Sequence, residues 1–128
     1  GVPLVVPLPR SLGWGDLKRF ARDFATLCAQ DEPDRYTVEL AKASRKGRIF
    51  IDWLRNERGS TAVAPFSVRA RPGAPVAAPV GWDELAGIAS ARAFGTQAAR
   101  ERGWAGIRRV RQSLTRPIFA ALDRALTG

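Results

Sequence analysis

Apolar side chains recur at helical spacing in the segment that follows residue 14. The residues on this stripe are Leu17, Phe20, Ala21, Phe24, Leu27 and Cys28. Because three- and four-residue steps return to one side of an α-helix, we expect a helix over residues 15–30 with one apolar face. Gly15 or Ser11 is the expected cap, and Asp16 in the first turn suits the helix dipole. Pro33 is expected to end the helix.

Short runs of β-branched and apolar residues predict strands elsewhere in the chain. They cover residues 4–8, 36–40 and 76–80, and a further strand is expected to begin at Arg48. A basic loop over residues 41–47 would join two of these strands. The proline- and glycine-rich segment 56–75 is interpreted as turns and extended pieces.

The segment RIFIDWLRN, residues 48–56, has apolar side chains on both faces if it is extended, and Asp52 lies among them. Alternation puts Phe50, Asp52 and Leu54 on one face and Ile49, Ile51 and Trp53 on the other. A carboxylate buried there would lose hydration, which costs several kcal/mol unless a cation offsets it. We therefore expect Asp52 to face a cation, and the residues alone leave open whether this is an arginine or a metal ion.

The C-terminal part of the chain is predicted to be helical. Residues 81–85 begin a helix or a helical turn, and residues 104–127 form the closing helical segment. Its expected inward-facing side chains are Ile107, Val110, Leu114, Ile118, Ala121, Leu122 and Leu126. Pro117 marks a kink or the first turn of a second helix, with Thr115 as its cap. Helices and strands together define an α+β fold, in which residues 1–128 form one partial domain.

The amino-acid composition excludes several kinds of catalytic and metal site. The 128 residues, 45% of them hydrophobic, suit one modest domain, and no apolar run is long enough to span a bilayer. The chain has no histidine and one cysteine, Cys28, which excludes zinc sites built from those ligands and histidine-based triads. Cys28 lies on the apolar helix face and is interpreted as a core residue. Any metal would be bound by oxygen ligands, which favours Mg²⁺ or Mn²⁺.

The net charge is +9, and the basic excess is concentrated after residue 34. Residues 35–72 contain nine basic and three acidic side chains, and arginine supplies 18 of the 21 cations. Such an excess favours a polyanionic partner, since guanidinium groups suit bidentate phosphate contacts. A basic protein without such a partner is the alternative.

The densest group of charges lies between residues 42 and 71. Its cations are Lys42, Arg45, Lys46, Arg48, Arg55, Arg58, Arg69 and Arg71. If SVRAR is extended, Arg69 and Arg71 project from one face and can bind neighbouring phosphates. The alternative is a pair of solvated arginines on an edge strand. Metal-assisted phosphoryl transfer generally needs two or three convergent carboxylates, and the other acids in the chain are poorly placed to accompany Asp52.

The stretch KASRKGRIFIDWLRNERGSTAVAPFSVRARPGAPVAAPVGWDEL, residues 42–85, resembles the C-terminal part of the polymerase domain of bacterial DNA ligase D. That domain belongs to the archaeo-eukaryotic primase superfamily. GVPLVVPL at the start and GWAGIRRVRQSLTRPIFAAL near the end are similar to other parts of it. The resemblance implies an RRM-like sheet with flanking helices. This chain corresponds to somewhat less than half of that polymerase domain.

The resemblance also implies site residues. Asp52, in the F-I-D-[YW]-L-R-N strand, corresponds to the third carboxylate of a divalent-metal site, and Arg55, Arg69 and Arg71 correspond to residues that bind the triphosphate. The family's other two carboxylates form an upstream Asp-x-Asp pair that is absent from this sequence. Pro3 occupies the position of a histidine near the incoming phosphates, and proline has no donor to replace it.

By this resemblance, the intact domain adds nucleotides, often ribonucleotides, to DNA 3′ ends during bacterial end joining. Mn²⁺ or Mg²⁺ is the implied cofactor, and DNA, a nucleoside triphosphate, the rest of the polymerase domain and a ligase domain are the implied partners in the bacterial cytoplasm. The chain contains no methionine and opens directly into an apparent strand, so we expect it to be part of something longer. Because one carboxylate of three cannot fix the metal ions, we expect the chain to be inactive alone. A non-catalytic nucleic-acid-binding module and an inactive remnant are the alternatives.

Overall fold

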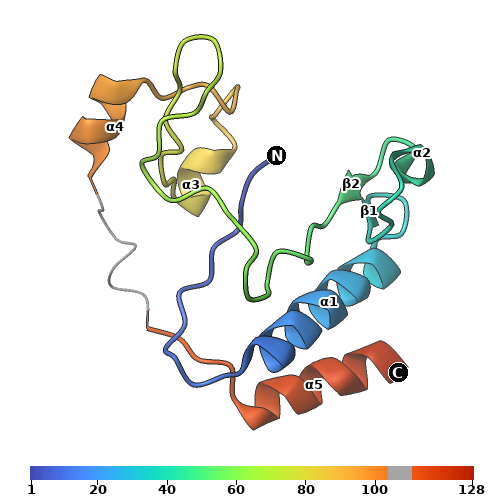
Figure 1. Cartoon of the computed structure of the whole chain (residues 1–128). Coiled ribbons are helices and arrows are strands. Elements are labelled where there is room, and N and C mark those ends of the chain that lie inside the picture. The colour runs from blue at the N-terminus through green and yellow to red at the C-terminus, as the bar shows by residue number, and fades with distance from the viewer. Residues whose placement is uncertain (104–110) are drawn as a thin grey trace. The chain divides into compact units, whose positions relative to one another are not determined.

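The structure is a computed structural model that describes residues 1–103 and 111–128. The predicted inward-facing residues Ile107 and Val110 lie outside the described part of the chain. Helices accompany a small two-stranded parallel sheet, which confirms the mixed α+β class (Figure 1). Among the described residues, none of the helices is both long enough and apolar enough to cross a membrane.

The chain divides into two compact units, and each is described by itself. The helical unit comprises Leu8–Thr61 and Ser113–Gly128. The hairpin unit comprises Gly1–Pro7 and Ala62–Gln112.

Helix α1, Trp14–Asp31, is the longest element of the helical unit and confirms the helix predicted from the apolar stripe. Asp16 lies in its first turn as expected, but the N-cap is Gly13, so the caps predicted at Gly15 and Ser11 are wrong. The helix ends at Asp31, and the C-cap residue Glu32 donates its N–H to the Cys28 carbonyl oxygen, just before the proline that was predicted to end the helix.

Helix α5, Arg116–Thr127, packs beside α1 (Figure 1). The rings of Phe20 and Phe119 meet edge to face, with centroids 5.2 Å apart. Ala25 of α1 and Leu122 of α5 are the buried core residues of the two helices. Ala25 lies beside the predicted stripe, whereas Phe24, which was placed on the stripe, is 45% exposed. The inward face was therefore predicted correctly only in part.

The start of α5 corrects one prediction and confirms another. Residues 111–115 are not helical, so the predicted closing segment is not one continuous helix and α5 begins at Arg116, while residues 104–110 lie outside the described part of the chain. Thr115 is its N-cap, and a proline, Pro117, lies in its first turn, as expected. Proline at this position lacks only an N–H that would have no intrahelical acceptor, which explains why the helix starts here.

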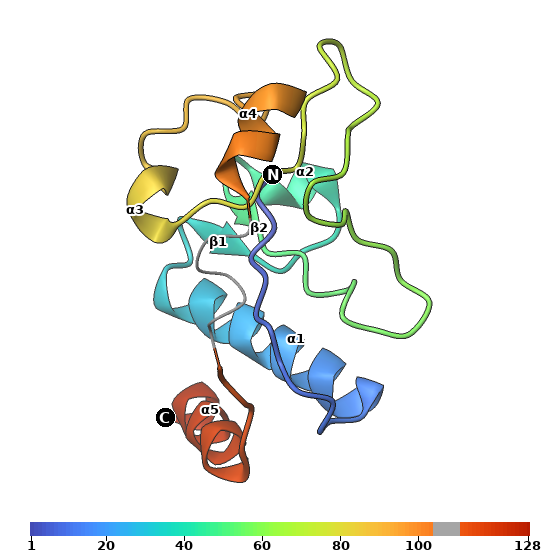
Figure 2. The ribbon, with the colours of Figure 1, turned by 90° about the vertical axis from the view of Figure 1, so that its left-hand side faces the viewer.

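The small sheet of the helical unit pairs strand β1, Tyr36–Thr37, with strand β2, Ile49–Phe50, in parallel. The two strands lie next to the C-terminal end of α1 (Figure 2). Between them, the predicted basic loop is in fact a single helical turn, α2, Lys42–Arg45. Both strands are shorter than predicted because each has one partner only within the described residues, and an isolated strand pair is marginally stable.

The hairpin unit is organised by an antiparallel bridge between Val68 and Val76. Val76 is its only residue in bridge geometry between residues 76 and 80, so the strand predicted there is not formed. Helix α3, Trp82–Leu85, is the helical turn expected at 81–85, and helix α4, Thr96–Arg102, follows. The core of the unit is small, with Val76 and Ala99 buried.

The N-terminal residues 1–9 form neither helix nor strand, so the strand predicted at residues 4–8 is not formed. Apolar side chains of this segment are exposed, Val2 by 69%, Leu4 by 63% and Val5 by 67%. A strand requires a neighbour, and the described part of the chain provides none, while Pro3 and Pro7 each remove a backbone donor.

Candidate functional site

Asp52 lies just beyond the C-terminal end of β2, in an open turn. Its Oδ1 accepts a hydrogen bond from the Leu54 N–H at 3.2 Å, and its Oδ2 lies 3.3 Å from Arg55 Nε. The Asp52 side chain is 42% exposed, so the prediction of a buried carboxylate inside a strand is wrong. The strand stops at Phe50 because pairing with β1 stops there, and the carboxylate folds back on its own backbone, as aspartate does in turns.

Arg55 completes this turn. Besides Asp52, its guanidinium contacts the Thr61 carbonyl oxygen, with Nη1 donating at 3.0 Å. Strict strand alternation would have put Arg55 and Asp52 on opposite faces, and the early end of β2 explains how they meet. The expectation that Asp52 faces a cation is confirmed, and in this structure the cation is Arg55.

Arg69 and Arg71 lie in the loop of the hairpin unit. The Arg69 N–H donates to the Pro75 carbonyl oxygen at 2.8 Å, and the Arg71 N–H donates to the Arg69 carbonyl oxygen at 2.8 Å. The second bond closes a three-residue turn, so SVRAR is not extended through Arg71 and the condition for a common face of Arg69 and Arg71 is not met. Both side chains are exposed, and within the described residues neither forms an ion pair or a side-chain hydrogen bond.

The four predicted site residues divide between the two units. Asp52 and Arg55 belong to the helical unit and contact each other directly. Arg69 and Arg71 belong to the hairpin unit. Their convergence with Asp52 on one nucleotide stays a prediction.

Two arginines of the basic middle region have structural partners. Arg45 lies over the Phe50 ring at 4.2 Å and donates to the Leu40 carbonyl oxygen, and Arg48 donates to three carbonyl oxygens. Besides Arg55, which pairs with Asp52, the exposed cations of this region are Lys42, Lys46, Arg58, Arg69 and Arg71. These five are therefore better placed than Arg45 and Arg48 to contact phosphates.

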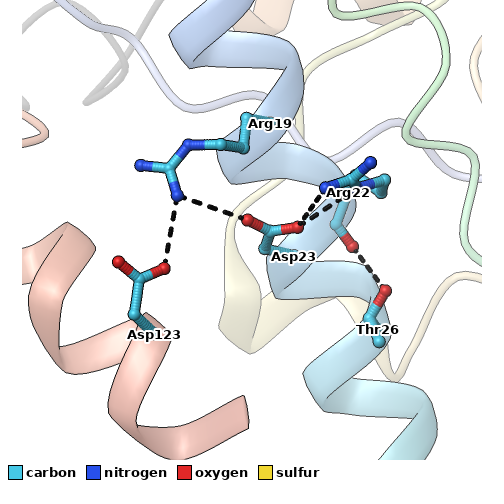
Figure 3. A network of polar contacts seen from close by, with 5 residues as sticks. All are labelled: Arg19, Arg22, Asp23, Thr26 and Asp123. Atoms are coloured by element: carbon cyan, nitrogen blue, oxygen red, sulfur yellow. Dashed lines mark hydrogen bonds and ion pairs between the residues drawn. The ribbon is translucent and has the colours of Figure 1, made fainter. Parts of the chain in front are cut away.

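The sequence analysis missed a hollow of about 350 Å³ beside α1, lined by Gly15, Lys18, Arg19, Arg22 and Trp53. Its cations all have acidic partners. Arg19 pairs with Asp23 and with Asp123 of α5, Arg22 pairs with Asp23 (Figure 3), and Lys18 pairs with Glu57. Because the charges balance, the hollow has little excess potential for an anion. The spacing of Arg19 and Arg22 by three residues could have indicated this cationic face of α1. The pairing with Asp123 could not be predicted, because that residue is distant in sequence.

No group of three or more potential metal ligands lies together among the described residues. Asp52 supplies one carboxylate, and a cation at its Oδ2 would have to displace Arg55. These residues therefore fit one ligand of a shared divalent-metal site and do not form such a site by themselves. Cys28 is a poor alternative for chemistry, because burial first and then the nearby Asp31 carboxylate raise the pKa of its thiol.

The sequence shows the family to which this chain belongs. The model of the family described as "LigD, primase-polymerase domain" matches residues 1–105, and the chain belongs to that family. The match includes Asp52, Arg55, Arg69 and Arg71 and confirms the resemblance found from the sequence. It ends before α5, so the resemblance of the closing segment stays a prediction.

Three relatives illustrate the match. The chain is 39% identical over 102 residues to a multifunctional non-homologous end joining protein LigD of Pseudomonas aeruginosa, which covers 80% of this chain and 12% of the relative. It is 37% identical over 86 residues to the protein of that name from Mycolicibacterium smegmatis, and the match covers 67% of this chain and 11% of the relative. A bifunctional non-homologous end joining protein LigD of Bacillus subtilis is 29% identical over 86 residues, and the match covers 66% of this chain and 14% of the relative. The chain thus spans only a small part of each relative's length.

Proposed function

We propose that this chain forms part of a DNA-repair primase-polymerase domain that adds nucleotides or ribonucleotides to DNA 3′ ends in bacterial non-homologous end joining. The family match over residues 1–105, together with the names of the relatives, is the observation that carries the proposal. The proposal includes an RRM-like sheet in the complete domain and a cytoplasmic setting. The partners would be DNA, a nucleoside triphosphate, the rest of the polymerase domain and a ligase domain.

The proposed role of Asp52 is to supply one carboxylate to a Mn²⁺ or Mg²⁺ site whose other ligands are not in this chain. When bound, such an ion polarises phosphoryl oxygens and orients the reacting groups. Arg55 would exchange its contact with Asp52 for one with a phosphate. Arg69 and Arg71, which are exposed and have no side-chain partner among the described residues, would neutralise charge on the triphosphate.

A second candidate function is binding of nucleic acid without catalysis. The observation that favours it is the set of exposed cations between residues 42 and 71 in a chain of net charge +9. Such binding would weaken steeply with salt and would not require a metal ion. Nitrocellulose filter binding of a labelled DNA, with and without EDTA, separates this behaviour from metal-dependent binding.

A chimera tests the proposed polymerase role. Residues 1–105 of this chain would replace the matching residues of the Pseudomonas aeruginosa relative, and extension of a DNA primer by ribonucleotides would be measured with Mn²⁺. We expect extension, its loss in EDTA, and a decrease by a factor of about 100 or more in Asp52→Asn. Asp34→Asn, which changes an exposed acid away from the turn, is the matched control.

The outcomes separate the two functions. A chimera that extends primers equally well with Asp52→Asn, or one that folds but does not extend, contradicts the polymerase proposal. The isolated 128-residue chain is expected to give no extension, because one carboxylate binds a catalytic metal ion too weakly.

A further inference from the structure

Arg48 lies between α2 and β2, and its guanidinium contacts the backbone of α2 and of the segment between α1 and β1. Nη2 donates to the Ser44 carbonyl oxygen at 2.7 Å, Nε to the Arg45 carbonyl oxygen at 3.1 Å, and Nη1 to the Pro33 carbonyl oxygen at 3.3 Å. The residue is half-buried. All three bonds use the planar fork of the guanidinium, which a lysine ammonium cannot reproduce in the same geometry.

The backbone around Arg48 has carbonyl groups without helical donors, and the Arg48 side chain donates hydrogen bonds to them. Helix α2 is one turn long, so its last carbonyl groups have no helical N–H to accept from. The chain then reverses through Lys46 and Gly47, which have φ values of 44° and 82°. The Arg48 N–H bonds the Arg45 carbonyl oxygen at 2.8 Å, and its side chain satisfies the neighbouring carbonyl groups. Arg48 therefore stabilises the reversal that leads into β2.

This reversal sets the position of Asp52. Directly after Arg48, the Ile49 N–H donates to the Arg35 carbonyl oxygen at 2.8 Å, and the Ile51 N–H donates to the Thr37 carbonyl oxygen at 3.0 Å. Asp52 follows the second of these bonds immediately. The Pro33 contact of Arg48 ties the same connection to the segment that leads from α1 into β1. A change in the connection would move β2 against β1 and, with it, the carboxylate.

We propose that Arg48 is a positioning residue that holds β2 in register with β1 and so places the turn of Asp52 and Arg55. Three of the five N–H donors of its guanidinium are used on backbone oxygens. The importance of this placement for activity rests on the proposed function. The placement itself is a property of the chain and is measured without any reaction.

The first test uses the complete 128-residue chain and two-dimensional ¹H–¹⁵N NMR. Arg48→Lys keeps the charge and removes the fork, whereas Arg48→Gln removes both. We expect both variants to shift or broaden the amide signals of Leu54 and Arg55 while α4 signals stay unchanged. Arg58→Lys and Arg58→Gln, at an exposed arginine in the next turn, are the controls and should leave Leu54 in place. An unchanged Leu54 signal in Arg48→Lys would overturn the proposal.

The second test uses the chimera and separates positioning from a general loss of stability. We expect Arg48→Lys to raise the Mn²⁺ concentration for half-maximal extension about tenfold, as loss of an orienting partner typically does, at a temperature well below its melting transition. An unchanged Mn²⁺ dependence would contradict positioning. If the unsubstituted chimera does not extend primers, the proposed function fails, while the NMR measurement still decides the role of Arg48.

Discussion

Glu84 shows how a single carboxylate is stabilised at a helix start. Its Oε2 accepts a hydrogen bond from the Gly81 N–H at 2.8 Å and pairs with Arg102 Nη2 at 2.7 Å. The Gly81 hydrogen bond, and after it Arg102, lower the pKa of Glu84 below its ordinary value. Arg102 also lies over the Phe94 ring and donates to the Pro79 carbonyl oxygen, so Glu84 belongs to the group of contacts that joins α3 to α4.

The lowered pKa predicts a pH dependence for the hairpin unit. A carboxyl group with a lower pKa when folded binds fewer protons in the folded state, so its contribution to stability is present above its unfolded pKa. That contribution is lost as the pH falls through its folded pKa. We expect Glu84→Gln to reduce the difference in urea midpoint between pH 7 and pH 3. Asp83→Asn makes the same charge change one residue earlier, and an equal effect there would contradict the role of Glu84.

For individual residues, the sequence predicted some features of the Asp52 turn and not others. The roles assigned to the motif residues around Asp52 stay predictions, and an arginine as the partner of that carboxylate was foreseen as one of two alternatives. The exposure of Asp52 was not, because alternation assumes that the strand continues. Its length depends on pairing with Tyr36 and Thr37, which a local pattern does not contain. The role of Arg48 was missed for a similar reason, since its contacts depend on the positive φ values of Lys46 and Gly47.

At the scale of elements, the pair of α1 and α5 gives the helical unit its packing. Phe20 and Phe119 contact each other edge to face, and Arg19 lies 5.1 Å from the centre of the Phe119 ring while it pairs with Asp123. The Arg19–Asp123 ion pair is exposed and contributes little to stability, whereas the contact between the Phe20 and Phe119 rings removes apolar surface from water. Packing between the helices should therefore depend on Phe119 more than on the charges.

We expect Phe119→Ala to lower the free energy of unfolding by ~2 kcal/mol, through lost apolar burial and the lost ring contact. Ile118→Ala, at a neighbouring position that is 40% exposed, should cost less than ~1 kcal/mol. Urea unfolding followed by circular dichroism at 222 nm measures both values. Equal losses in the two variants would show that α5 does not use Phe119 to pack on α1.

Helices were predicted better than strands in this chain. Periodicity identified α1, and Thr115 with Pro117 identified the start of α5, because these are local features. The strands predicted at residues 4–8 and 76–80 are absent as strands, since an apolar run forms one only where a neighbouring strand accepts its hydrogen bonds. The helical turn α2 was missed because it is one turn long and has no apolar period.

At the scale of the whole molecule, charge and family membership carry the functional argument. The net charge of +9 favours a polyanionic partner, and the match over residues 1–105 identifies the domain family. The structure separates the cations that are bound to backbone oxygens from those that are exposed. It shows Arg45 and Arg48 bound to backbone oxygens, and it leaves Arg69 and Arg71 exposed without a side-chain partner among the described residues.

The exposed apolar N-terminal segment has a consequence for the behaviour of the purified chain in solution. Exposed apolar side chains such as Val2, Leu4 and Val5 favour self-association of this unpaired segment, while the net charge of +9 makes the molecules repel each other. Salt weakens the repulsion, because the Debye length falls from about 10 Å at 0.1 M to about 3 Å at 1 M. Light scattering should therefore show particle size increasing with NaCl, and Val5→Lys should reduce the increase. The colloidal stability of the purified chain would then decrease as ionic strength rises.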